Sequence, residues 1–228
     1  MDEKKYIIGN WKSNKNLLEV RSWFTEFNEL FKQGSQTSLD NLEIVICPPF
    51  IYLPEATKLI NNYNLPISLG AQDVSPFTTG AYTGEVGASQ IADFAKFVLI
   101  GHSERRSNFG ENSQLLFAKT EQAEQQGLQV IYCVPDNQTK IPQSVGLVAY
   151  EPVWAIGTGK TESAENAVKV ADVIRKNLNA AKIIYGGSVN SKNIKDFLAE
   201  NGLDGVLPGG ASLDASLFWE MIKNASRI

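Results

Sequence analysis

Residues 97–133 read FVLIGHSERRSNFGENSQLLFAKTEQAEQQGLQVIYC, and this stretch decides the fold class. It begins with the apolar run Phe97 to Ile100 and closes on a second run, Val130 to Cys133. Between the two runs lies an amphipathic segment that ends at Gly127, and glycine is the common residue at the end of a helix. Two short apolar strands joined through a helix form a unit whose strands run parallel.

The same alternation extends along the whole chain of 228 residues, without a low-complexity linker or a change in composition. We therefore predict one α/β domain over residues 1–228, built on a single parallel sheet. The residues leave two arrangements open, an open doubly wound sheet or a closed barrel. Eight runs are expected to be strands: Tyr6 to Gly9, Ile44 to Cys47, Ile67 to Gly70, Phe97 to Ile100, Val130 to Cys133, Leu147 to Tyr150, Ile183 to Tyr185 and Gly205 to Leu207.

One crossover differs from the others. The connector from Pro135 to Val145 has eleven residues and includes Pro142, whereas a crossover with its helix takes at least about ten to twelve residues. Because prolines do not occur in helix interiors, we expect this connector to lack a helix. Extended chain spans about 3.3 Å per residue, so the connector can still return along a strand of about 20 Å. The missing helix predicts apolar surface beside the fifth and sixth strands, covered by local repacking or by a partner.

Composition and charge exclude several classes of function. The chain has 21 basic and 25 acidic residues, and its net charge of -4 disfavours a nucleic-acid-binding surface. No apolar run reaches the length of about 18 residues that a membrane-spanning helix needs, so we expect a soluble, cytoplasmic protein. Cys47 and Cys133 are expected to be buried and reduced. His102 is the only histidine, which argues against a metal site.

Polar residues follow the expected strands at the point where each strand ends. Asn10 and Lys12 follow the first strand, and His102 and Glu104 follow the fourth. Glu151 follows the sixth strand. Because the carboxyl ends of parallel strands open on one face, we expect these side chains to meet in one pocket.

Glu151 is the candidate general base. It ends the apolar run Leu147 to Tyr150, and Pro152 keeps it extended, so that its carboxylate projects from the strand end. A carboxylate partly withdrawn from water accepts protons more readily near neutral pH. Most glutamates are simply surface residues, but the position at the tip of an apolar run favours a function.

His102 and Lys12 have weaker individual signals. A neutral His102 ring at a helix start could donate a hydrogen bond to a carbonyl group, although a lone histidine is more often structural. Lys12 could balance the negative charge of a substrate in a protein whose net charge repels anions, although most lysines are only solvated. The functional interpretation of both residues therefore depends on their meeting Glu151.

Two glycine clusters suggest binding of a phosphate group, and a third glycine-bearing segment suggests a lid. Gly186-Gly187-Ser188 and Gly209-Gly210-Ala211-Ser212 offer unhindered backbone N–H groups, although glycine pairs after strands also form ordinary turns. The segment from Pro152 to Lys160 is apolar and contains glycines, which suits a lid that closes over a ligand. It is not a nucleotide-binding P-loop, because that motif needs a glycine where Trp154 stands.

Together these segments resemble the triosephosphate isomerase family. The resemblance implies a closed (β/α)8 TIM barrel that lacks the helix between strands five and six. It also implies interconversion of dihydroxyacetone phosphate and D-glyceraldehyde 3-phosphate through an enediol(ate), in glycolysis and gluconeogenesis, with no cofactor and no metal. Five motifs carry it, in the family's order and nearly end to end: Asn10-Trp11-Lys12, Gly101-His102-Ser103-Glu104-Arg105-Arg106, Ala149-Tyr150-Glu151-Pro152-Val153-Trp154-Ala155-Ile156-Gly157-Thr158-Gly159-Lys160, Tyr185-Gly186-Gly187-Ser188-Val189 and Gly209-Gly210-Ala211-Ser212.

The resemblance also implies a role for individual residues. Glu151 would move the proton between two substrate carbons, and His102 would polarise the carbonyl group. Lys12 and Asn10 would stabilise the developing oxyanion, and Glu104 would orient the lysine. The phosphate would be held by backbone N–H groups of Gly157, Ser188, Gly209 and Gly210. The lid would comprise Pro152, Val153, Trp154, Ala155, Ile156, Gly157, Thr158, Gly159 and Lys160.

The resemblance extends to a partner. The segment from Gln72 to Gly87 resembles the loop that reaches into a neighbouring subunit in this family, so a homodimer is implied. Triose phosphates are the implied small-molecule ligands. Neither nucleic acid nor membrane is implied as a partner.

Two departures from the family pattern stand out. Val134-Pro135-Asp136 occurs where the family usually has Ile-Gly-Glu, which removes the glutamate expected beneath Trp154. Pro208 occurs where a branched aliphatic residue is usual, and it is expected to stiffen the following turn.

Two other functions remain as alternatives. The trimmed outer layer would suit a catalytically silent scaffold, and the fold alone would also permit another phosphate-binding barrel enzyme. The joint presence of Lys12, His102 and Glu151 favours the isomerase over both.

Overall fold

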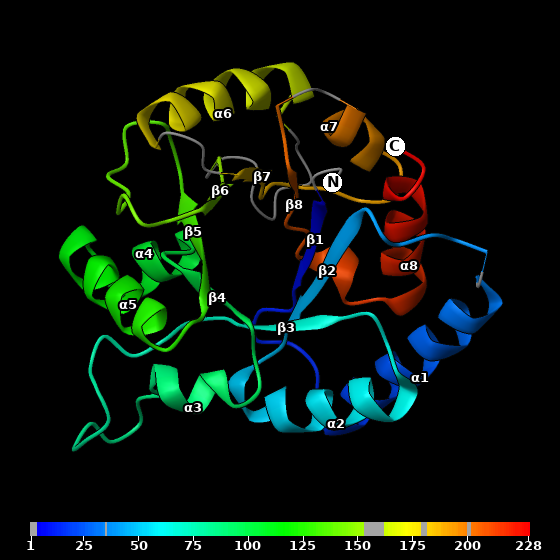
Figure 1. Cartoon of the computed structure of the whole chain (residues 1–228), viewed down its shortest axis with the longest axis horizontal. Helices are drawn as coiled ribbons and strands as arrows, with labels where there is room; N and C mark the ends of the chain where they lie inside the picture. Colours follow the sequence, from blue (N-terminus) through cyan, green and yellow to red (C-terminus); the bar gives the residue numbers. More distant parts are fainter. Residues whose placement is uncertain (1–3, 35, 153–161, 179–181, 200–201) are drawn as a thin grey trace.

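The computed structural model describes residues 4–34, 36–152, 162–178, 182–199 and 202–228. Within them, eight parallel strands form one closed barrel whose strand order follows the sequence (Figure 1). The closed barrel implied by the family resemblance is thereby confirmed. The strands are β1 (Lys5–Asn10), β2 (Leu42–Cys47), β3 (Ser68–Ala71), β4 (Phe97–Ile100), β5 (Gln129–Val134), β6 (Leu147–Tyr150), β7 (Lys182–Tyr185) and β8 (Gly205–Val206).

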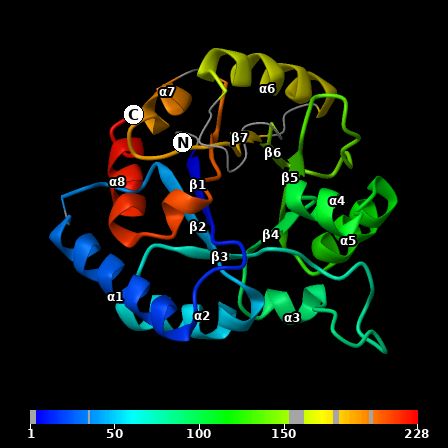
Figure 2. The same cartoon turned by 180° about the vertical axis from the view of Figure 1, so that it is seen from behind.

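Helices form an outer ring around the barrel, visible from both sides (Figures 1 and 2). The longest, α1 (Leu17–Gln33), begins at a capping box in which the side chains of Asn16 and Glu19 each accept from the other's backbone N–H. The others described are η1 (Phe50–Tyr52), α2 (Leu53–Tyr63), α3 (Ala88–Ala92), α4 (Ser103–Phe109), α5 (Ser113–Gln125), α6 (Ala164–Leu178), α7 (Ile194–Ala199), η3 (Gly210–Ser212) and α8 (Ala215–Ala225).

Successive strand residues alternate between the barrel interior and the layer beneath the helices. In β6, Leu147 and Ala149 belong to the interior cluster, whereas Val148 packs in the cluster that includes the helices. Glu151 continues the interior set, so the alternation directs its side chain toward the barrel mouth. Gly186 occupies the matching position after β7, because Tyr150 pairs with Tyr185 in the register of the two strands.

The connector between β5 and β6 contains no helix over residues 135–146, as predicted, and consists of turns, bends and irregular chain. Asp136 organises it, because its Oδ1 accepts two backbone N–H bonds from the following turn. Ile141 and Val145 of the connector pack against the core, and Tyr132 beneath them is fully buried. The apolar surface expected beside these strands is therefore largely covered by local repacking. A groove of about 350 Å³ remains between α5 and α6.

All eight predicted strands are present, and their ends differ from the prediction by at most two residues; β4 and β6 match it at both ends. For example, β3 begins at Ser68 rather than Ile67, and β8 ends at Val206 rather than Leu207. Among the helices described, none combines the length and the apolar character needed to cross a membrane.

Candidate active site

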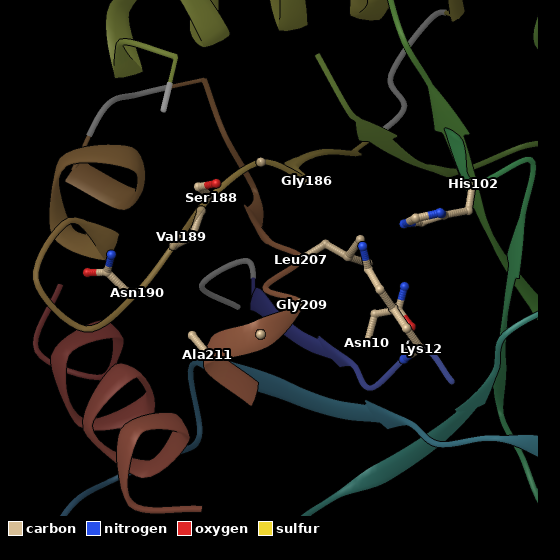
Figure 3. Close-up of a pocket in the computed structure, with 12 residues that line it drawn as sticks. Asn10, Lys12, His102, Gly186, Ser188, Val189, Asn190, Leu207, Gly209 and Ala211 are labelled. Atoms are coloured by element: carbon tan, nitrogen blue, oxygen red, sulfur yellow. Dashed lines mark hydrogen bonds between the residues drawn. The ribbon is translucent and has the colours of Figure 1, made fainter. Parts of the chain in front are cut away.

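A cavity of about 310 Å³ opens at the carboxyl ends of the strands, which is the size range of small-molecule sites (Figure 3). It brings together six residues predicted from the ends of four different strands: Asn10, Lys12, His102, Ser188, Gly209 and Gly210. Figure 3 shows Asn10, Lys12 and His102 at one end of the cavity, and Ser188 with Asn190 at the other. The remaining lining residues are Gly186, Gly187, Val189, Asn190, Leu207 and Ala211.

Glu151 does not itself line this cavity, but it lies next to two residues that do, His102 and Gly186, and its side chain is only 1% exposed. Its Oε2 accepts a hydrogen bond of 3.0 Å from the backbone N–H of Ser103. Its Oε1 lies 3.3 Å from Nε2 of His102 and accepts no hydrogen bond from the described residues. Gly186 makes room for the carboxylate, since a Cβ there would lie 2.7 Å from Cγ of Glu151. A buried carboxylate with one oxygen that accepts no hydrogen bond from the described residues is suited to accept a proton.

His102 is held in one tautomer by its position as N-cap of α4. Its Nδ1 accepts a 3.2 Å hydrogen bond from the backbone N–H of Glu104, so the neutral ring carries its proton on Nε2. Gly101, with a φ of 74°, supplies the left-handed turn that brings the ring to the cavity after β4 ends. The arrangement directs an N–H donor from the ring toward the cavity and Glu151.

Lys12 and its neighbours form a charged corner of the cavity. Nζ of Lys12 lies 2.5 Å from Oε1 of Glu104, which places the glutamate where it can orient the ammonium group. The backbone N–H of Lys12 donates to Oδ1 of Asn10, so the amide N–H group of Asn10 remains the donor that can face a ligand. The Lys12 side chain also borders the turn at Gly209, since the Cβ position of Gly209 lies 3.4 Å from its Cε.

The backbone of Lys12 has a φ of 53°, an uncommon conformation for a residue with a side chain. Gln72, which follows β3, holds it there: its Nε2 donates to the carbonyl oxygens of Lys12 at 2.9 Å and Cys47 at 2.8 Å. Strained conformations persist at functional sites when the surroundings over-determine them. The sequence predicts no such role for Gln72, because nothing local links it to a lysine 60 positions earlier.

Two further residues of the His102 motif, Ser103 and Arg106, hold the turn in place. Ser103 contributes the backbone N–H that binds Glu151. The Arg106 guanidinium donates to the carbonyl oxygens of Gly101 and Cys133, which ties the turn to the end of β5. Ser103 could have been predicted from the sequence, because it directly follows His102. The contact of Arg106 with the end of β5 could not, because no local pattern indicates it.

The Cys133 side chain lies beneath the carboxylate. Burial and the neighbouring Glu151 both raise the pKa of the Cys133 thiol well above its usual range. The thiol is therefore neutral near pH 7, and it does not compete with Glu151 as a charged group.

The far end of the cavity is built from backbone. Gly209 precedes η3 and Gly210 begins it, and the first N–H groups of a helical turn have no partner within that turn. Ser188 follows β7, where its carbonyl oxygen accepts from the side chain of Asn193. Exposed N–H groups at such turns are suited to bind an anion. Gly157 and the lid residues from Val153 to Lys160 lie outside the described residues.

Comparison with known proteins agrees with this geometry. The family model for triosephosphate isomerase matches residues 5–225. The triosephosphate isomerase of Mesomycoplasma hyopneumoniae is 37% identical over 97% of this chain and 100% of its own length. Those of Dictyoglomus turgidum and Hahella chejuensis are 39% and 36% identical, again over 97% of this chain and 99% and 98% of their own lengths. The chain therefore belongs to the triosephosphate isomerase family.

Proposed function

We propose that the cavity interconverts dihydroxyacetone phosphate and D-glyceraldehyde 3-phosphate, with Glu151 as the base that moves the proton. Its Oε1 would take a proton from one substrate carbon and return it to the neighbouring carbon. The hydroxyl proton would pass from one substrate oxygen to the other in the same reaction, so that the substrate keeps its atoms and its charge. This role is supported by the burial of Glu151 and by its Oε1, which accepts no hydrogen bond from the described residues.

His102 and Lys12 would stabilise the negative charge that develops on the substrate oxygens. The Nε2–H group of His102 would donate to the carbonyl oxygen, because its Nδ1 is already occupied by a backbone N–H. The Lys12 ammonium, with the Asn10 amide beside it, would balance the enediolate charge. Donors held in place before the reaction are effective because they need no reorganisation during it.

The phosphate group would occupy the opposite end of the cavity, at Ser188, Gly209 and Gly210. We also retain Gly157 as a fourth phosphate contact and residues 152–160 as the lid. Such a lid would keep water away from the enediolate.

One observation carries the proposal: Oε1 of Glu151 lies 3.3 Å from Nε2 of His102, and His102 lines the cavity together with Lys12. The test is a coupled assay with either triose phosphate. Glu151→Gln should lower kcat by at least about 100-fold, since proton transfer by a positioned base contributes roughly 100- to 10,000-fold. Inhibition by inorganic phosphate should stay within about two-fold of the wild type, because the phosphate end is untouched.

Glu165→Gln provides the matched control, because Glu165 is exposed and, among the described residues, forms its ion pair with Lys169 on α6. It should leave kcat unchanged. Full turnover of the Glu151→Gln enzyme would show that another group is the base.

We also propose a homodimer through the segment 72–87. The tip of this segment projects from the barrel (Figure 1) and carries Phe77 and Tyr82, which are 45% and 42% exposed. Their rings stack with centroids 4.2 Å apart. Leu18 and Ile51, which follow β1 and β2, are each 76% exposed. Large apolar side chains exposed in this number are typical of an interface.

The dimer is tested by light scattering after size-exclusion chromatography. Phe77→Asp should raise the dimer dissociation constant by at least about 100-fold, as expected for an apolar anchor in an interface. Val173→Asp, on the exposed face of α6, is the control and should leave it unchanged. A monomeric wild type at micromolar concentration would contradict the proposal.

We propose a cytoplasmic location. Cys47 and Cys133 are buried and form no disulfide, which is compatible with a reducing compartment. Cell fractionation with an antibody to the chain tests this, and recovery of the protein outside the cytoplasmic fraction would contradict it.

A further inference from the structure

One buried carbonyl group fastens η3 to the rest of the protein. The indole Nε1 groups of Trp11 and Trp23 both donate to the backbone oxygen of Ser212, each at 3.1 Å. Ser212 is fully buried, and its carbonyl closes η3, where it has no partner within the helical turn. A carbonyl oxygen has two lone pairs, and a buried one needs partners for them. The two indoles supply both.

The position of Ser212 determines the positions of the two glycines that line the cavity. Its backbone N–H donates to the carbonyl oxygen of Gly209 at 2.9 Å, and its Oγ donates to the same oxygen at 2.7 Å. The N–H of Leu213 donates to the carbonyl oxygen of Gly210 at 3.1 Å. A shift of Ser212 would therefore move the turn that begins at Gly209.

Trp23 reaches Ser212 from α1 and does not line the cavity. It is 3% exposed and sits in an aromatic cluster, stacked on Phe27 with ring centroids 5.1 Å apart and edge-on to Trp11 at the same separation. Trp11 belongs to the first sequence motif after β1. Trp23 belongs to none of the motifs, so its link to the turn is visible only in the folded chain.

We propose that Trp23 is a positioning residue for phosphate binding: its indole N–H holds the Ser212 carbonyl and thereby keeps the N–H groups of Gly209 and Gly210 directed into the cavity. The inference rests on the proposed function, which assigns the phosphate group to this turn. Backbone donors bind an anion well only when they are held in place beforehand.

Trp23→Phe tests the proposal, because phenylalanine keeps an aromatic ring in the cluster and removes the N–H donor. The KM for D-glyceraldehyde 3-phosphate and the inhibition constant of inorganic phosphate should both rise, by roughly two- to ten-fold for the loss of one hydrogen bond. The kcat should stay within about two-fold, because an interaction that holds substrate and transition state equally affects KM alone.

Trp219→Phe is the matched control. Trp219 is also 3% exposed and packs edge-on against Phe27, but no hydrogen bond from its indole to η3 occurs among the described residues. The Trp219→Phe variant should leave the KM and the phosphate inhibition constant unchanged, even where it lowers thermal stability. A merely structural role for Trp23 would reduce the fraction of active enzyme, and hence the apparent kcat, while KM and the phosphate inhibition constant stayed at their wild-type values.

Unchanged constants in a folded Trp23→Phe enzyme would overturn the inference. If that variant does not fold, benzothienylalanine at position 23 gives the same comparison, because it keeps the fused ring and replaces the N–H by sulfur. Activity and phosphate inhibition of the wild-type enzyme distinguish a failure of the proposed function from a failure of the role of Trp23. A wild type without isomerase activity or phosphate inhibition would refute the proposed function, whereas an active, phosphate-sensitive wild type with an unaltered variant would refute only the role of Trp23.

Discussion

Replacing Gly186 by alanine should disable Glu151 while leaving the carboxyl group chemically intact. The new Cβ would lie 2.7 Å from Cγ of Glu151 and 3.4 Å from its Oε1. Carbon atoms in contact stay about 3.5 to 4.0 Å apart, so the glutamate side chain has to move by about 1 Å. Because Glu151 is 1% exposed, that movement also disturbs its contacts with His102 and Ser103. A misplacement of about 1 Å can cost roughly 100-fold in rate.

The assay for Gly186→Ala is steady-state turnover of either triose phosphate, with inorganic phosphate as a competitive inhibitor. We expect kcat to fall by about 100-fold, while the inhibition constant of phosphate stays within about three-fold, because the contacts of the added methyl group are with Glu151 and Tyr150 rather than η3. Gly146→Ala is the control, since a Cβ at Gly146, just before β6, meets nothing within 4 Å.

A Gly186→Ala enzyme with wild-type thermal stability and a kcat within a factor of about three would refute the reasoning. Either the carboxylate would tolerate displacement, or it would not be the group that moves the proton. A large loss of kcat in the Gly146→Ala control would show that the assay reports general damage to β6.

Two further predictions concern stability. Lys119 is 3% exposed and pairs with Asp73 and Glu111, so Lys119→Met should lower the free energy of unfolding, measured in urea, by about 3 kcal/mol. The exposed control Lys169→Met should lower it by less than about 0.5 kcal/mol. Equal losses in the two variants would contradict the prediction. Asp214 caps α8, and the backbone N–H of Leu217 lowers the pKa of its carboxyl group. Asp214→Ala should therefore cost about 1 kcal/mol at neutral pH, and the difference should disappear as the pH falls below about 4 and the native carboxylate takes up its proton; a difference that persists at low pH would contradict it.

Much of the fold could be predicted because its signals are local. A strand of a parallel barrel is a short apolar run, and its crossover helix is an amphipathic stretch, so periodicity alone located all eight strands to within one or two residues. Pro135 and Pro142 likewise predicted a connector without a helix. Closure of the sheet into a barrel could not be predicted from periodicity, because an open sheet satisfies the same pattern. The family resemblance favoured the closed barrel over the open sheet.

The candidate site was predictable only where its residues follow strands. Asn10, Lys12, His102 and Glu151 could be named because the carboxyl ends of parallel strands share one face. Residues that act on them from elsewhere could not. Gln72 is 60 positions from the lysine that it holds.

The sequence by itself determined which residues form strands, which of them end on polar groups, and that these ends open together. The tertiary structure decided which groups touch. Trp23 and Ser212 are 189 positions apart, and a hydrogen bond between them requires both within about 3 Å, which local periodicity does not encode. Lys119 lies on an ordinary helical stretch, and only the closed outer layer buries it between two carboxylates. Such contacts arise when barrel closure brings distant segments together, because packing selects among the many pairings that the same local pattern allows.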